Sequence, residues 1–571
     1  MISGVSGDSA GQAPARRHGG RGPFIESLLL ATVALAVLNF HPFGSAHLRR
    51  HFSQDLIYAW FGDAEWLHPR LPGSAGLRLA PPRAVVMLVD DAALALRGAA
   101  WPVPAAFHAQ LLTELEVLRP RAVMLDFLLL DRPPSDDICA LLAAADRLRS
   151  DRIPVYLAVT RQEDLSRLMN ANCMDDAGKP LRADEVLIPV SVRRQADETD
   201  FVSRRYPFEE ADFEQPDEAV GQGAEGGAPG LPSAAVRIYC DMAAQRDRCA
   251  ADLERGALPQ AGFELAWSPR GDPFNRRWSK AGCGGPPASL RAIVDRTMFP
   301  RETGCPPIAT LFASALLSPA EDSALGANNE QLFDLVEGST VFIGGNFRAS
   351  GDLITTPMHT LLPGVYYHAV AFENLAIFGG KPKIREEFRR FPLGIYLYDW
   401  CVLWALAAIF VWREKWIGAD AEAMHHGPLS PSLSARAWVA HLIARTPVAL
   451  SLSLLVVASL FLAAYPVLQL WTLIAAIVTA VCIEVRVASR GELKERLRNV
   501  GLYLGALGLS LTVVAFAIWF GYRWLRLPPG DWVGYLSFST VGFFVAHTAI
   551  VDFGRHVGSI RLTRTASGGV S

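Results

Sequence analysis

Two apolar segments decide the fold: Arg83–Asp90 (RAVVMLVD) and Ala122–Leu130 (AVMLDFLLL). Each is an almost continuous apolar run with an aspartate at or near its end, which is typical of strands buried on both faces of a parallel sheet. Between them, apolar side chains recur at helical spacing over Pro104–Leu118. The order strand, helix, strand indicates an α/β domain.

The same alternation continues along the chain. Asp137–Leu148 is expected to be a helix and Ile153–Ala158 a strand, and far downstream Ser339–Gly345 and Gly364–Phe378 repeat the pair. The intervening segment Arg161–Pro307 is rich in glycine, proline and acidic residues, so we expect a long insertion of extended loops. The predicted fold is an α/β domain with a mostly parallel sheet, flanking helices and this loop insertion.

The composition predicts a second, membrane-embedded part. The 571-residue chain is 51% hydrophobic and 19% charged, whereas soluble proteins usually carry about 25% charged residues. A membrane-spanning helix needs roughly 20 predominantly apolar residues. Six runs approach that length: Phe24–Phe43, Leu393–Trp412, Val448–Tyr465, Val467–Val485, Gly501–Phe520 and Trp532–Val551. We therefore expect an α-helical transmembrane bundle.

Basic residues near the ends of these runs set the orientation, because they favour the cytoplasmic side. The N-terminal tail carries Arg16, Arg17 and Arg21, and arginines also follow the last run. The expected order is a cytoplasmic tail (1–23), a first helix (24–43), an exported domain (44–390) with its insertion at 161–307, a second helix (391–412), a cytoplasmic loop (413–446), helices three to six (447–551) and a cytoplasmic tail (552–571). This map places the chain in the inner membrane of a bacterium. A cleaved signal peptide ending near Gly44–Ala46 is the alternative.

Six of the eight cysteines fall in the expected exported domain: Cys139, Cys173, Cys240, Cys249, Cys283 and Cys305. An oxidising compartment permits disulfides, although their pairing cannot be deduced from sequence alone. We favour Cys240–Cys249 and Cys283–Cys305, and interpret Cys139 as a buried thiol in a helix. No Cys-x-x-Cys or comparable histidine spacing suggests zinc, so no metal or other cofactor is predicted.

Two stretches resemble the halves of a CHASE2 domain. The first, VMLVDDAALALRGAAWPVPAAFHAQLLTEL with VMLDFLLLD, has a strand ending in aspartate, a Trp-Pro pair, a His-Ala helix and a strand ending in Asp-Phe. The second, VFIGGNFRASGDLITTPMHTLLPGVYYHAVAFENLAIFGG, has the Gly-Asp, Thr-Pro, Pro-Gly-Val and His-Ala-x-x-x-x-Asn-Leu series. The resemblance covers about Arg83–Gly379 and implies an extracytoplasmic sensor domain. Val103 and Ala105–Ala106 stand where such domains often carry a second tryptophan and an arginine.

Several polar residues are candidates for a ligand site. Asp90, Asp91 and Asp126 close neighbouring predicted strands, and ligand sites in open α/β sheets lie beyond the carboxyl ends of strands. With Asp352 they are expected to form one acidic pocket, unless each only caps a local turn or helix. The remaining candidates are Trp101, His108, Thr356 and His368, for which a packed turn or structural hydrogen bonds are the alternatives.

These observations predict a membrane-bound sensory protein. Members of the resembled family commonly continue into a kinase or cyclase, but the 413–446 loop and the tail after Val551 are too short for a domain of roughly 100–150 residues. We therefore expect a non-enzymatic sensor that binds an unknown extracytoplasmic ligand, relays to a separate signalling partner and can form a homo-oligomer. The net charge of −3 argues against nucleic acid. A membrane scaffold or envelope-assembly component is the alternative, and an enzyme is the third option.

Overall fold

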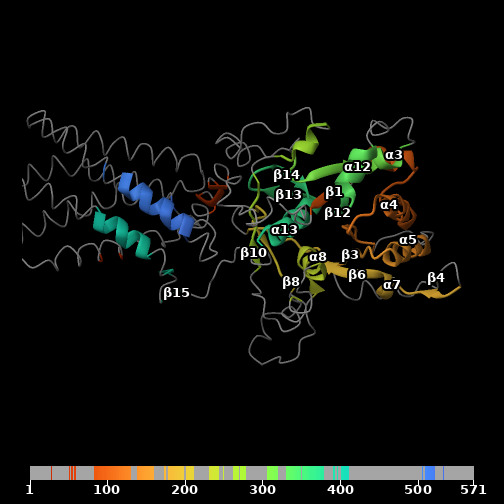
Figure 1. The fold of residues 1–571 in the computed structure, drawn as a ribbon, viewed down its shortest axis with the longest axis horizontal. Helices are drawn as coiled ribbons and strands as arrows, with labels where there is room; N and C mark the ends of the chain where they lie inside the picture. The colour runs from red at the N-terminus through yellow and green to blue at the C-terminus, as the bar shows by residue number, and fades with distance from the viewer. Residues whose placement is uncertain are drawn as a thin grey trace, which may run out of the picture. The chain divides into compact units, whose positions relative to one another are not determined.

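The computed structural model describes residues 83–129, 138–159, 173–174, 178–197, 201–210, 231–242, 262–268, 271–277, 305–318, 329–348, 350–378, 400–409 and 508–520, with shorter pieces or single residues elsewhere. The chain divides into two compact units (Figure 1). One comprises Arg50–Glu387 and Ile518–Asp531. The other comprises Met1–Arg49, Phe388–Ala517 and Trp532–Ser571.

The first unit is built on a six-stranded, fully parallel sheet. Its strands, in spatial order, are β11 (Ala309–Phe312), β1 (Ala84–Asp90), β12 (Thr340–Asn346), β2 (Ala122–Leu125), β3 (Val155–Val159) and β6 (Leu187–Ser191). The four strands predicted from sequence are confirmed. They form the centre of the sheet, and β2 ends earlier than expected, at Leu125. The predicted α/β class with a parallel sheet is therefore correct.

The edge strand β6 lies inside the segment expected to be an insertion of loops, so that prediction is wrong at this point. It is a five-residue strand that contains Pro189 and pairs with one named strand, β3, apart from a single bridge between Ser191 and Ser233. Proline is tolerated on an edge strand because the missing N–H would face away from the sheet. A short run interrupted by proline carries too little periodicity to be recognised from sequence.

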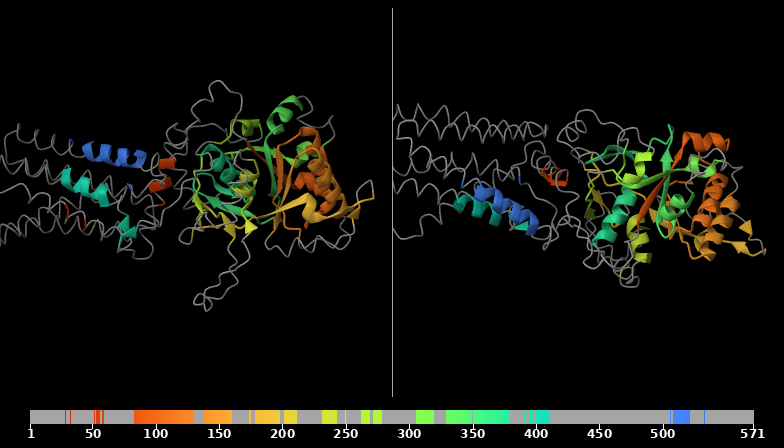
Figure 2. Two further views of the ribbon diagram at one scale, coloured as in Figure 1. Left: turned by 60° about the horizontal axis from the view of Figure 1, so that its bottom comes forward. Right: turned by 45° about the horizontal axis from the view of Figure 1, so that its top comes forward.

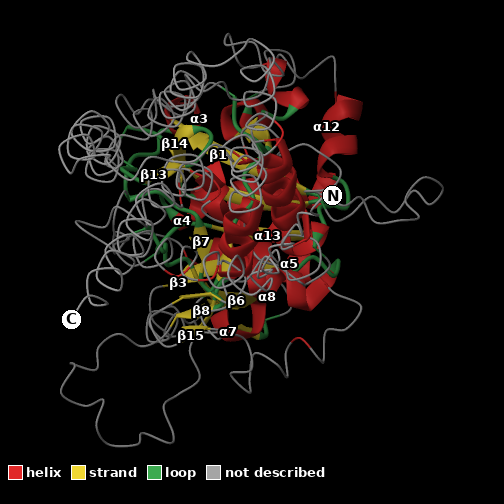
Figure 3. Ribbon diagram, turned by 90° about the vertical axis from the view of Figure 1, so that its left-hand side faces the viewer, coloured by secondary structure: helices red, strands yellow, loops and turns green. Residues whose placement is uncertain are grey.

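Helices cover both faces of the sheet, as Figures 1 to 3 show. One face packs, through alternate strand residues such as Val85 and Met87, against α4 (Ala105–Leu118) and α5 (Ile138–Ser150). The shorter helices α3 (Asp91–Leu96), α11 (Ala313–Leu317) and α12 (Asn329–Val336) join the same core. The other face packs against α8 (Ala234–Met242) and α13 (Val365–Ile377), for example through the Phe342–Phe372 ring contact.

Small elements surround this framework. In the first unit they are β4 (Cys173–Met174), β5 (Pro180–Leu181), α7 (Ala183–Val186), β7 (Arg205–Tyr206), β8 (Glu209–Glu210), β9 (Leu231–Pro232), β10 (Phe263–Glu264), the 3-10 helix η3 (Pro273–Arg277), β13 (Leu353–Thr356) and β14 (Thr360–Pro363). Most come from the predicted insertion. Trp267 in it is fully buried and donates its indole N–H to Ser203 O, so the described parts of the insertion are packed structure.

The disulfides agree with the sequence only in part. Cys240 pairs with Cys249, as predicted. Cys139 pairs with Cys173, so its interpretation as a buried thiol is wrong: the bridge ties α5 to β4, which lies in the segment read as an insertion. Cys305 is also disulfide-bonded. Because Cys283 lies outside the described residues, the pair Cys283–Cys305 stays a prediction.

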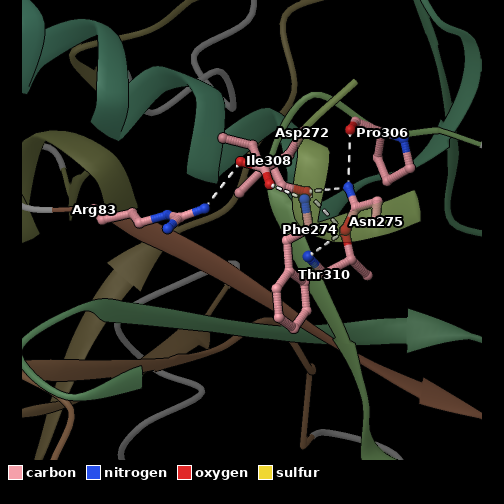
Figure 4. A network of polar contacts seen from close by, with 7 residues as sticks. All are labelled: Arg83, Asp272, Phe274, Asn275, Pro306, Ile308 and Thr310. Atoms are coloured by element: carbon pink, nitrogen blue, oxygen red, sulfur yellow. Dashed lines mark hydrogen bonds and ion pairs between the residues drawn. The ribbon is translucent and has the colours of Figure 1, made fainter. Parts of the chain in front are cut away.

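A polar network closes the amino end of the sheet at β11 (Figure 4). The Asn275 side chain donates to Pro306 O and Ile308 O and accepts from the Thr310 amide at 2.8 Å. Asp272 accepts from the Phe274 amide and from Arg83, the residue before β1, at 3.0 Å. The edge strand is thereby joined to η3 and to the start of β1.

The second unit is described over short pieces, including β15 (Arg390–Phe391), β16 (Ile395–Tyr396) and helical segments at 400–409 and 508–520. The two helical segments fall within the predicted apolar runs Leu393–Trp412 and Gly501–Phe520. None of the helices in the described ranges is both long and apolar enough to cross a membrane. The predicted runs Val448–Tyr465 and Val467–Val485 lie outside the described residues, as do nearly all of Phe24–Phe43 and Trp532–Val551.

Candidate functional site

The candidate site begins at Asp126, directly after β2. Its amide donates to Ile343 O at 2.8 Å, which continues the pairing of β2 with β12 and fixes the residue at the carboxyl end of the sheet. Only 9% of its side chain is exposed. The next residue, Phe127, packs against the His108 ring in the core on the α4 face. No residue in the described part of the chain donates a hydrogen bond to the Asp126 carboxylate.

His368 of α13 lies beside this carboxylate, with its Nε2 atom 4.0 Å from Asp126 Oδ2. Its Nδ1 shares a 2.7 Å hydrogen bond with the hydroxyl of Tyr206 in β7. That hydroxyl also accepts the Ala235 N–H at 3.0 Å. Because the Tyr206 oxygen accepts from Ala235, its own proton can be donated to Nδ1, and the neutral imidazole then carries its proton on Nε2, facing Asp126.

Asp352, just before β13, provides a second carboxylate. The residue is exposed, yet its carboxylate packs on Gly364, the N-cap of α13: a Cβ at Gly364 would lie 2.3 Å from Asp352 Oδ2. A side chain at this position would therefore displace the Asp352 carboxylate. Arg194, after β6, donates to Leu353 O at 3.3 Å and brings its positive charge near Asp352. Tyr367 completes the group; its hydroxyl donates to Arg205 O and accepts the Gln195 N–H.

The protonation states follow from burial and from these neighbours. Burial raises the pKa of Asp126 well above its usual value, and the charge of Asp352 raises it further. Although Asp352 is exposed as a residue, partial desolvation of its carboxyl group where it packs on Gly364 raises its pKa, against the opposing effects of the Arg194 charge and the Gly364 amide. Burial lowers the pKa of His368 to about 3. The cluster therefore combines a neutral imidazole with two carboxyl groups that disfavour simultaneous ionisation.

The structure places His368 beside Asp126 and the charge of Asp352 near it, whereas Asp90 and Asp91 have other local environments. Asp90 accepts from the Ala93 amide as the N-cap of α3 and also bonds the amide and hydroxyl of Ser314. Asp91 is exposed in the first turn of the same helix. The alternative in which these residues cap local structure is therefore correct for Asp90, and the single pocket of four carboxylates stays a prediction.

The other predicted residues have separate environments. Trp101 is 52% exposed and stacks on Phe347, with ring centroids 5.5 Å apart. Thr356 is buried, and its hydroxyl accepts the His359 amide. His108 is fully buried beside Phe127, its ring nitrogens have no hydrogen-bond partner, and burial lowers its pKa to about 4. In the part of the chain that the structure describes, no hydrogen bond or ion pair joins any of the three to Asp126.

Sequence reasoning missed Tyr206 and Arg194, which complete the site. Both come from short pieces of the segment predicted to be loops, and a two-residue strand such as β7 leaves no periodic signal. Within the described ranges, no group of three or more histidine, cysteine or acidic side chains could hold a metal ion.

Comparison with known proteins places the chain in a family. The family model for the CHASE2 domain matches residues 30–410, about two thirds of the chain. No curated protein and no solved structure matches the chain significantly. CHASE2 domains are sensory domains that typically lie outside the cytoplasm, which supports a sensory role. The chain belongs to the CHASE2 domain family.

Proposed function

We propose that this protein is a membrane-bound sensor that detects its stimulus at the Asp126 cluster of an exported CHASE2 domain and relays it to a separate signalling partner. The observation that carries the proposal is the Asp126 carboxylate, whose side chain is only 9% exposed and which accepts no hydrogen bond from a described residue. Buried polar groups normally have partners, so an exception at the carboxyl end of a parallel sheet points to a binding function.

The proposal is tested in the native host by replacing Asp126 with Asn on the chromosome. The change keeps the side-chain shape and removes the ionisable group. A sensor whose stimulus acts here should then alter the same set of transcripts as deletion of the gene, with unchanged protein abundance. Asp91→Asn is the matched control, because it makes the same chemical change at the same sheet edge on an exposed residue.

Two other outcomes would contradict the proposal. Equal transcript changes in both variants would show that the Asp126 site has no special role. A deletion strain with a defective envelope, combined with a silent Asp126→Asn variant, would favour the alternative of an envelope scaffold.

The proposed topology has its own test. Reporters fused after Gly418 or after Ser571 should report the cytoplasm, and a reporter inserted near Gly227 should report the exported side. The opposite signal at any of these three positions would contradict the six-helix arrangement.

A further inference from the structure

The surroundings of Asp126 disfavour a negative charge on its carboxylate. Its side chain is 9% exposed, and His368 Nε2 lies 4.0 Å from its Oδ2 atom. Hydrogen bonds between nitrogen and oxygen are normally about 2.7–3.2 Å long, so this contact is too long to be one. Burying an ionised carboxylate without hydrogen bonds is costly, and such a group neutralises itself instead.

The groups that face the cluster leave one negative charge uncompensated. His368 and Tyr367 face it from α13, Tyr206 from β7, Asp352 from the segment before β13, and Arg194 from the segment after β6. Burial keeps His368 neutral and both tyrosines protonated, because it lowers the pKa of the histidine and raises the pKa of each tyrosine. Two carboxylates thus face a single guanidinium, and one bound proton would neutralise the cluster.

We infer that the Asp126–Asp352 pair is a proton-binding site and that the stimulus detected there is the pH outside the membrane. The inference rests on the proposed function for the location of the site. A proton enters between existing side chains, so this ligand needs no cavity. Deprotonation breaks the O–H bond of the carboxylic acid and transfers the proton to water, and no electrons are exchanged.

His368 and Tyr206 provide a way to read the protonation state. When Asp126 ionises, its oxygen becomes an acceptor for the Nε2–H of His368, and the present 4.0 Å separation would shorten to about 3 Å. Movement of His368 also moves Tyr206, to which its Nδ1 is bonded. Arg204, two residues before Tyr206 and just before β7, forms a buried ion pair with Asp55 at 2.9 Å. Asp55 lies in the segment that follows the predicted first membrane helix.

Infrared difference spectroscopy on the full-length protein tests the inference. A protonated carboxylic acid gives a C=O stretching band that an ionised carboxylate lacks. We expect this band near pH 7 in the unmodified protein and in Asp91→Asn, and its loss in Asp126→Asn. Glu373, another buried acid, contributes equally to all three spectra, so the difference between the two variants isolates Asp126. Asp352→Asn should lower the pH at which the Asp126 band disappears, because the like charge is removed.

Thermal unfolding of the same samples checks the fold. Asp126→Asn removes a buried ionisable group, so its melting temperature should equal or exceed that of the unmodified protein near pH 8. If Asp126→Asn melts normally and its spectrum near pH 7 matches that of Asp91→Asn, Asp126 is ionised and the proton site is refuted. The transcript changes expected of a sensor could still occur with a different ligand, so the two proposals fail separately.

Discussion

At the amino end of the parallel sheet, the Asn275 side chain bonds three backbone groups, whereas at the carboxyl end the Asp126 carboxylate accepts no hydrogen bond from a described residue. Both side chains are buried or nearly so. A buried polar group with all its partners stabilises one structure. A polar group without partners remains able to bind a ligand or a proton. The difference supports a structural role for the amino end and agrees with the sensing role that we propose for the carboxyl end.

The largest effect is expected at the buried ion pair between Arg204, two residues before Tyr206, and Asp55 of the N-terminal segment. The side chains of Arg204 and Asp55 are 3% and 1% exposed. Arg204→Met would remove the guanidinium from this buried ion pair, and breaking such a pair by removing one partner costs about 3–5 kcal/mol. Urea unfolding of the full-length protein should show this loss, and the double variant Arg204→Met/Asp55→Leu should recover much of it. If the single and double variants unfold alike, the ion pair does not hold the segment.

The second prediction concerns Glu373 at the amino end of the sheet, because its titration must be distinguished from that of Asp126. Burial raises the pKa of this carboxyl from 4.5 to about 7, although the Ala84 amide and the Arg83 charge lower it. An acid whose pKa is raised on folding weakens the folded state progressively from pH 4.5 up to about pH 7, and by a constant amount above that. Glu373→Gln should therefore stabilise the protein by up to about 3.5 kcal/mol near pH 8, since one pKa unit corresponds to about 1.4 kcal/mol.

Near pH 4 the same substitution should change the stability little, because Glu373 is protonated in both states. Melting curves at the two pH values check the sign. If Glu373→Gln, rather than Asp126→Asn, abolished the response of the protein to pH in cells, the proposed pH site at the carboxyl end would be contradicted.

The central strands and helices could be predicted from sequence because their apolar residues follow the patterns of buried strands and of helices. The runs Ala84–Asp90 and Thr340–Asn346 are apolar on both faces, and the helix Ala105–Leu118 begins after Pro104 and ends at Arg119 in a left-handed conformation. Asp126 and His368 were found because they occupy the end of a strand and the first turns of a helix, where ligand sites form.

The rest of the site could not be predicted, because its residues are brought together only by contacts between positions far apart in the sequence. Tyr206 lies 162 residues from His368, and nothing local marks the two as partners. Asp90 and Asp126 look alike in sequence, since both end strands. Asp90 caps the helix that follows it through the Ala93 amide and also bonds Ser314, 224 residues away, which no local pattern marks.

The third prediction tests the structural role of the amino end. Asn275→Ala removes a donor to Pro306 O and Ile308 O and leaves the buried Thr310 amide without its acceptor. Leaving a buried polar group unsatisfied costs about 1–3 kcal/mol, so we expect a loss of about 2 kcal/mol in unfolding free energy. The infrared band of Asp126 should persist in this variant. Its disappearance would mean that the two ends are not independent.

The smallest effect separates two aspartates at the carboxyl end itself. Asp90→Ala removes the N-cap of α3 and the bonds to Ser314, and loss of such a cap costs typically about 1 kcal/mol. Asp91→Ala changes an exposed residue in the same helix, where surface substitutions stay within about 0.5 kcal/mol. Urea unfolding of the two variants side by side should resolve the difference, and neither should change the Asp126 band. A band that shifts in Asp90→Ala would place Asp90 within reach of the proton site, and the carboxyl end would then act as one acidic unit after all.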